Sequence, residues 1–147
     1  MSYFSALEIG ASALTAQRLR MDTISQNIAN ANTTRTNNGS PYRRREVIFE
    51  EKTLSAPFSD YLSKNSKERF IGQGVRVAKI VEDSTPFKKI YDPGNPDADT
   101  EGYVQMPNVD IVTEMVNMIS ATRAYEANVT SMNNTKSIAM KALEIGR

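Results

Sequence analysis

The last third of the sequence constrains the fold most strongly, because apolar residues recur there every seven positions with no proline between them. One set is Ile111, Met118, Tyr125, Met132 and Ala139, and the set four positions later is Met115, Thr122, Val129, Lys136 and Leu143. This spacing is typical of the seam of a coiled-coil helix. It predicts a helix from Asn108 to about Glu144, which would be ~55 Å long. Asn108 is the expected N-cap, and Asp110 and Glu114 bring negative charge to the helix start, where the helix dipole favours it.

A second amphipathic helix is predicted at the beginning of the sequence, from Tyr3 to Asn32. Its apolar row is Leu7, Leu14, Met21 and Ile28, and Phe4, Ala11, Ile24 and Ala31 widen that row. Because each helix has an apolar seam, we expect the first and last helices to pair as an antiparallel coiled coil. The residues expected to pack on the first helix are Ile111, Met115, Met118, Tyr125, Val129 and Met132.

The region between the two helices has a different pattern. Asn38-Gly39-Ser40-Pro41 is a turn signal, and alternating apolar residues predict strands over 42–51 and 75–83, with a third over 86–93. Residues 52–70 are polar and irregular and are predicted to form a mobile loop. The predicted fold class is mainly α, with a helical core domain (residues 1–32 and 108–147) and a small, partly flexible β-rich insert (residues 33–107).

The last helix has more apolar surface than one partner helix can cover. Beside its seam lies a second row made of Val109, Val112, Val116 and Ile119. Exposed apolar patches of this kind mark contacts with other chains. We therefore expect this second row to pack against neighbouring subunits.

The end of the first helix carries an unusual group of polar side chains. Ser25, Asn27 and Asn30 lie beside the apolar residues Ile24 and Ile28. Asparagine amides at the edge of an apolar row can form hydrogen bonds to the side, which indicates a helix packed against more than one neighbour. The alternative is a frayed, solvated helix end, since asparagine favours caps and turns.

The composition excludes several functional classes. The sequence contains no histidine and no cysteine, which removes the usual bases, thiolate nucleophiles and cysteine zinc ligands. A net charge of +1 does not favour general binding to nucleic acid, and Arg43-Arg44-Arg45 are interpreted as a solvated strand face. No apolar segment is long enough to cross a membrane, and no cleavable signal peptide is apparent. We predict a protein that is not an enzyme and has no catalytic residues, cofactor or small-molecule substrate.

One acidic segment resembles part of a calcium-binding loop. Asp97, Asp99, Glu101 and Gly102 match positions one, three, five and six of an EF-hand loop, but Asn108 occupies position twelve, where a bidentate glutamate is needed. The preceding YDPGNP cannot be helical. The segment is therefore interpreted as an acidic surface turn, and no metal site is predicted.

ALTAQRLRMDTISQNIANANTTRT resembles the amino-terminal signature of the bacterial flagellar axial proteins, the rod and hook family. The matching positions are Ser25, Asn27, Ala29, Asn30 and Thr33 or Thr34. SPYRRREVIFE, the long segment GVRVAKIVEDSTPFKKIYDPGNPDADTEGYVQMPNVDIVTEMVNMISATRAYEANV and the closing KALEIG are similar to the proximal-rod members of that family. Asn95 departs from the histidine expected in many members, and no function depends on it.

The resemblance implies a structural subunit of the flagellar basal body. Rod proteins of this family pass through the flagellar type III export apparatus and polymerise in the periplasmic space into a hollow drive shaft. The implied partners are neighbouring copies and other rod subunits, and the paired terminal helices form the inner layer of the tube. The alternative is a soluble coiled-coil adaptor or secretion chaperone that binds one partner helix.

Overall fold

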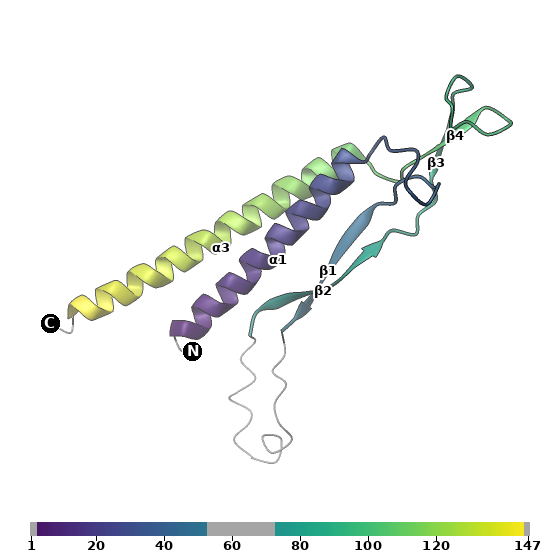
Figure 1. Cartoon of the computed structure of the whole chain (residues 1–147). Helices are drawn as coiled ribbons and strands as arrows, with labels where there is room; N and C mark the ends of the chain where they lie inside the picture. Colours follow the sequence, from purple (N-terminus) through teal and green to yellow (C-terminus); the bar gives the residue numbers. More distant parts are fainter. Residues whose placement is uncertain (1–2, 53–72, 146–147) are drawn as a thin grey trace, which may run out of the picture.

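The computed structural model describes residues 3–52 and 73–145, which form two long helices and two small antiparallel sheets (Figure 1). The elements, in chain order, are α1 (Tyr3–Ala29), β1 (Arg45–Glu51), β2 (Val75–Glu82), β3 (Lys88–Tyr91), β4 (Tyr103–Met106) and α3 (Ile111–Ile145). The structure thus confirms the two predicted long helices and a smaller β part between them. No helix in these two ranges is long and apolar enough to cross a membrane.

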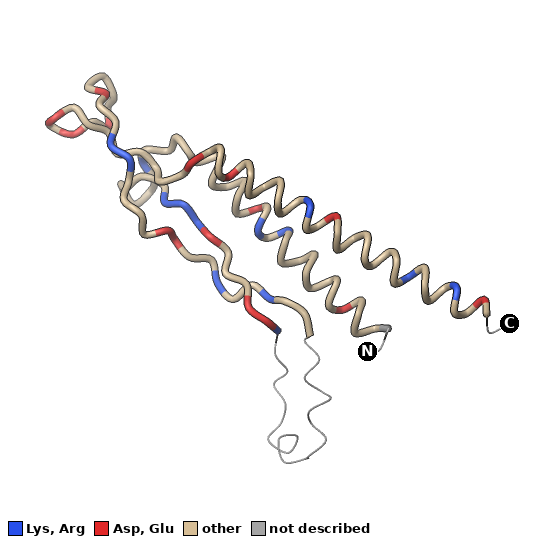
Figure 2. The backbone as a smooth tube through the Cα atoms, turned by 180° about the vertical axis from the view of Figure 1, so that it is seen from behind, with Lys and Arg blue, Asp and Glu red and all other residues tan. Residues whose placement is uncertain are grey.

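The two helices lie side by side and run in opposite directions, with both chain ends at the same end of the pair (Figures 1 and 2). Their contacts follow this direction along the whole pair. Gly10 lies against Met132, the Thr122 hydroxyl is 3.7 Å from the Met21 sulfur, and the Asn27 amide bonds the Glu114 carboxylate. A Cβ at residue 10 would lie 2.7 Å from the Met132 Cγ, so Gly10 permits the close approach of the helices.

The seam on α3 differs in part from the predicted one. Met118, Tyr125, Val129 and Met132 are half-buried, as a seam requires, but Ile111 and Met115 are exposed, Met115 at 56%. The row that faces α1 beside Met118 contains Glu114 and Ala121, which are both fully buried. The prediction selected the larger apolar side chains. The helices instead approach closely where α3 presents small or hydrogen-bonded ones.

The β1–β2 hairpin packs along α1 on the side away from α3, so α1 lies between the hairpin and α3 (Figure 1). The strands pair antiparallel, with a bulge where Phe49 pairs with Val77 rather than the next residue in register. Both strands match the predicted ranges within a few residues. The segment predicted to be mobile, 52–70, lies outside the described residues apart from Lys52.

A second hairpin, β3–β4, forms an arm beyond the end of the helix pair (Figures 1 and 2). The strand predicted over 86–93 is β3, whereas β4 was not predicted. The Tyr91 and Tyr103 rings pack edge to face, with centroids 5.3 Å apart. The Asp99 carboxylate accepts bonds from the backbone N–H groups of Glu101 and Tyr103, and Asp97 accepts one from the Thr34 hydroxyl. In the described ranges, no group of three or more acidic side chains is placed to hold a metal.

Gly74 fixes the hairpin to α1, and we expect its replacement by alanine to loosen this contact. Gly74 has φ +99°, and a Cβ there would lie 2.1 Å from the Ser12 hydroxyl oxygen, which accepts a bond from the Val75 N–H. The strained backbone and the overlap should together cost about 2–4 kcal/mol of unfolding free energy. Gly39→Ala is the matched control in urea unfolding, because Gly39 also has positive φ but has no atom within 4 Å of its would-be Cβ. Equal losses in the two variants would contradict a role for Gly74 in seating the hairpin.

Candidate functional site: a buried polar junction and the apolar face it orients

The side-chain amide of Asn27 is the centre of a buried polar junction where α1, β1 and α3 meet. Asn27 is 0% exposed. Its Nδ2 donates to the Arg45 carbonyl (2.8 Å) and to the Glu114 Oε2 (2.9 Å). Its Oδ1 accepts from the Tyr42 hydroxyl and from the Arg45 N–H, both at 3.0 Å. All four hydrogen-bonding positions of the amide are therefore used, and they join three segments of the chain.

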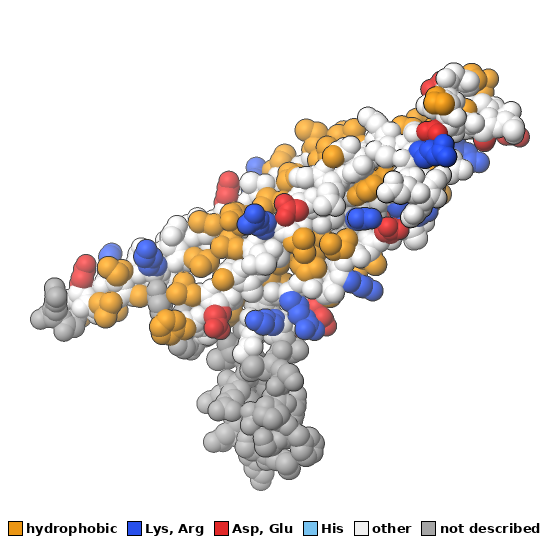
Figure 3. Space-filling view, in the orientation of Figure 1, with side chains coloured by type: hydrophobic (Ala, Val, Ile, Leu, Met, Phe, Trp, Pro, Cys, Tyr) orange, Lys and Arg blue, Asp and Glu red, His pale blue; other side chains and the backbone are white. Residues whose placement is uncertain are grey.

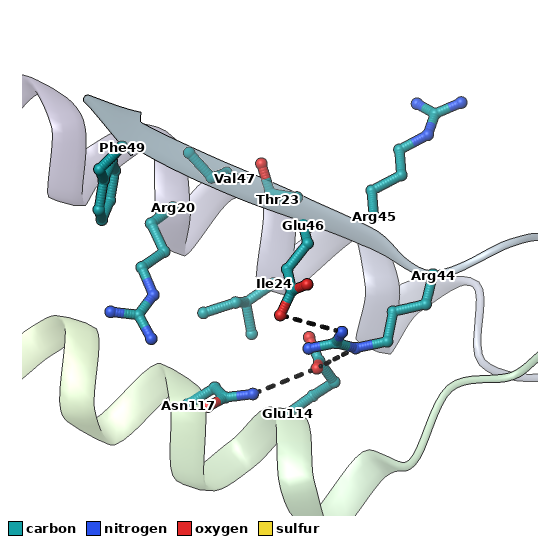
Figure 4. A pocket seen from close by; sticks show the side chains of 10 residues that line it. All are labelled: Arg20, Thr23, Ile24, Arg44, Arg45, Glu46, Val47, Phe49, Glu114 and Asn117. Atoms are coloured by element: carbon teal, nitrogen blue, oxygen red, sulfur yellow. Dashed lines mark hydrogen bonds and ion pairs between the residues drawn. The ribbon is translucent and has the colours of Figure 1, made fainter. Parts of the chain in front are cut away.

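Glu114 carries a buried negative charge that is matched inside the junction. Its side chain is 1% exposed, and its Oε1 accepts from the Arg44 Nε at 2.9 Å and from the Asn117 Nδ2 at 3.4 Å (Figure 4). A second nitrogen of Arg44 lies 3.3 Å from Glu46 and 3.4 Å from Asp83. Burial lowers the pKa of Arg44, but the bonds and charges of Glu114 and Glu46 outweigh it and raise that pKa, so the guanidinium stays charged. Arg44, predicted as part of a solvated face, is instead half-buried and paired.

The predicted N-cap of α3, Asn108, does not cap the helix, and Asp110 does so instead. α3 begins at Ile111, and the Asp110 carboxylate accepts from the Val112 N–H at 3.0 Å. This bond holds the pKa of Asp110 below its ordinary value. Asn108 instead accepts from the Arg44 N–H and donates to Thr85, so it ties the residue before β1 to the segment before β3. An asparagine at this position could cap α3 or bond a neighbouring segment. Here it bonds the neighbouring segment, because the chain at the start of β1 lies close to it.

The remaining polar residues at the end of α1 have local roles. The Asn30 Nδ2 donates to the Gln26 carbonyl, and its Oδ1 accepts from the Thr33 hydroxyl at 3.2 Å. Ser25 is exposed. The frayed-end alternative is therefore wrong for Asn27, which is packed between neighbours, whereas Asn30 shapes the turn that ends the helix.

The hydroxyl group of Tyr42 makes the stability of the junction depend on pH in the alkaline range. Burial raises the pKa of its hydroxyl, against the opposing effect of Arg45. The folded state therefore holds this proton more tightly than the unfolded chain does. Its contribution to stability is complete below the ordinary tyrosine pKa of about 10 and is lost as the pH rises through the higher folded value. We expect the urea midpoint to fall more steeply above about pH 10 in the parent than in Tyr42→Phe, which lacks this proton. Parallel pH curves would contradict the coupling.

The opposite side of the first turns of α3 is an exposed apolar face. We call Ile111, Val112, Met115, Val116 and Ile119 the α3 face, and all five are exposed. Figure 3 shows hydrophobic side chains exposed over the helix pair. Because Glu114 is bound in the junction, the rotation of α3 about its axis is fixed, and the α3 face must point away from α1. Val112, Val116 and Ile119 thus lie where the second apolar row was predicted to be exposed.

Val109 departs from that row. It is 6% exposed and packs with Ala31 and Tyr42, because it precedes the helix and the chain turns inward there. In α1, Ile24 is buried, while Leu7, Leu14, Met21 and Ile28 are half-buried. Sequence reasoning missed Tyr42, Arg44 and the burial of Glu114. The position of Glu114 could have indicated its burial. It lies seven residues before Ala121 and four before Met118, which places the three residues on the same side of the helix.

Comparisons with known proteins identify the family of the chain. A family model described as Flagella basal body rod protein matches residues 7–35, and one described as Flagellar basal body rod FlgEFG protein C-terminal matches residues 100–145. The chain is 54% identical to the flagellar basal-body rod protein FlgC of Bacillus subtilis, with 100% of both chains covered. It is 50% identical to FlgC of Borreliella burgdorferi, covering 99% of this chain and 98% of the relative, and 41% identical to FlgC of Escherichia coli O157:H7 over the full length of both. The chain therefore belongs to the FlgC family of flagellar basal-body rod proteins.

Proposed function

We propose that this chain is a structural, non-enzymatic subunit of the flagellar basal-body rod, located where the basal body spans the periplasm. Full-length similarity to relatives named as rod proteins supports this proposal. The structural observation that carries it is the α3 face, an apolar surface without a partner in the described chain, held in a fixed orientation by the polar junction. A surface of this kind suits repeated contacts with neighbouring subunits.

We propose that the chain has two parts, a helical core domain and an insert. Residues 1–32 and 108–147 form the helical core domain, in which α1 and α3 pair as an antiparallel coiled coil, and residues 33–107 are an insert that braces it. The ordered contacts of Gly10 with Met132 and of Met21 with Thr122 support the coiled-coil pairing. The half-buried row of Met118, Tyr125 and Met132 supports it too.

The proposed partners are other copies of this chain and other rod subunits, and the flagellar type III export apparatus delivers the chain to the assembly site. The polymer is the hollow drive shaft. Export in an unfolded form fits the limited core, which in the described residues contains only a few fully buried side chains. Assembly then buries the apolar surface that the single subunit leaves exposed.

The test is a strain that lacks this gene and carries a tagged copy of the chain. The deletion should abolish swimming in soft agar, the tagged copy should restore it, and the tag should be present in purified basal bodies. A tagged chain that restores swimming but stays in the cytoplasm with one partner protein would favour the adaptor or chaperone alternative and contradict a rod subunit.

A further inference from the structure

A groove lies beside the junction, between β1 and the first turns of α3, with α1 as its floor. Figure 4 shows its lining, which includes Arg20, Ile24, Val47, Phe49 and Asn117. Its volume is about 260 Å³. That is below the usual range of small-molecule sites, about 300–1,000 Å³, so the groove suits a few side chains rather than a cofactor.

One of the cations that line the groove, Arg20, is not paired with an anion of the described chain. Figure 4 shows Arg20 and Arg44 extending into the groove with Glu46 and Glu114, whereas Arg45 points away from it. Arg44 pairs with Glu114 and Glu46, and Arg45 pairs with Glu82 at 3.6 Å. Among the described residues, Arg20 has no hydrogen-bond or ion-pair partner, and Figure 4 shows it extending from α1 beside Val47 and Phe49. A half-buried guanidinium next to an apolar wall calls for one carboxylate flanked by apolar groups.

The other end of the molecule carries that combination. Gly10 lies level with Met132, so Tyr3 lies level with about residue 139, and the last turns of α3 extend ~9 Å past α1. Figure 3 shows hydrophobic side chains exposed on this projecting end. Met140, Leu143 and Glu144 lie on one face there, at i, i+3 and i+4, and all three are exposed, Leu143 at 72%.

We propose that the projecting end of α3 of one copy docks on the groove of a second copy, with Glu144 pairing with Arg20 and with Met140 and Leu143 against Val47 and Phe49. The two surfaces lie at different places on the chain, so the contact is heterologous and leaves each copy with one unused half. Such a contact continues from copy to copy instead of closing on a pair. This inference rests on the proposed rod assembly, for which it names one contact.

Charge exchange tests the pairing in cells that carry only the variant chain. Arg20→Glu and Glu144→Arg should each reduce the number of rod-bearing basal bodies by about tenfold, because each variant places two like charges at the contact. The double variant Arg20→Glu/Glu144→Arg should restore most of that number. Arg18→Glu and Glu126→Arg are matched controls, because both residues are exposed and lie outside the groove and the projecting end. Single variants that assemble normally, or a double variant no better than the singles, would overturn the proposal.

Cysteine cross-linking separates this inference from the proposed function. The natural chain has no cysteine, so a bond between introduced cysteines is unambiguous. Within one copy, Arg20 lies near Thr122, ~33 Å along α3 from Glu144, and a disulfide needs Cα atoms within about 7 Å. Cells that express Arg20→Cys and Glu144→Cys copies together should yield a disulfide dimer in purified basal bodies, and Arg18→Cys with Glu144→Cys should not. Chains present in basal bodies without this dimer would overturn the contact but not the rod function, whereas chains absent from basal bodies would contradict both.

Discussion

Asn27→Ala is expected to destabilise the subunit by about 4 kcal/mol or more, close to the whole stability of a small domain. The alanine leaves the Tyr42 hydroxyl, the Arg45 N–H and carbonyl and one Glu114 oxygen without their partner. Each buried polar group that loses its bond costs about 1–3 kcal/mol, and the charged carboxylate lies at the upper end of that range. The loss also removes the amide bridge between β1 and α3, and the Arg44–Glu114 ion pair must then hold the two together.

Urea unfolding followed by circular dichroism measures this loss. Asn32→Ala is the matched control, because Asn32 is exposed three residues after the end of α1 and should change stability by no more than about 0.5 kcal/mol. Asn27→Asp is a second comparison. It keeps the size of the side chain but replaces the donor to Glu114 with a like charge, and it should be nearly as harmful as the alanine. A loss below about 1 kcal/mol in Asn27→Ala would mean that the junction does not hold the three elements together.

The secondary structure followed from periodicity wherever one pattern continued over many residues. Apolar residues seven apart gave both long helices, and alternation gave β1 and β2. The ends of the helices do not follow from periodicity, because side chains from other elements decide them. Asn108 was expected to cap α3, but it bonds the backbone of Arg44, the residue before β1, and Asp110 takes the cap. β4 contains only four residues and owes its strand conformation to its pairing with β3.

The partner-facing side of α3 could not be read from hydrophobicity alone. Met115 and Glu114 are adjacent, and a hydrophobicity argument puts the methionine inside and the glutamate outside. In the structure the glutamate is buried and the methionine is exposed, because Arg44 and Asn27, from distant parts of the chain, bond the glutamate carboxylate. A buried charge of this kind becomes predictable only when its partners are known. The asparagine motif identified the right place in the sequence, and only the fold revealed its partners.

Val116→Asp is expected to abolish swimming while leaving the single subunit folded. Val116 belongs to the α3 face and is 61% exposed, so the aspartate stays solvated in the monomer, whose stability should change by no more than about 0.5 kcal/mol. At a contact with a neighbour, the variant loses the burial of a valine, worth roughly 1.5–3 kcal/mol. It also places an unpaired carboxylate against apolar groups, which costs several kcal/mol more. The subunit should therefore remain soluble and exportable and yet fail to build a rod.

Soft-agar motility and electron microscopy of purified basal bodies measure the result, and circular dichroism checks that the monomer is unchanged. Ser131→Asp is the matched control, because Ser131 is exposed on α3 but lies ~18 Å along the helix from Ile119, outside the α3 face. It adds the same charge and should swim. If Val116→Asp cells build a normal rod, the α3 face does not contact a neighbour. If Ser131→Asp fails as completely as Val116→Asp, added negative charge rather than loss of the apolar contact is responsible. The predicted contrast between these two positions follows from the place of the α3 face, which lies on the first turns of α3 opposite the buried Glu114.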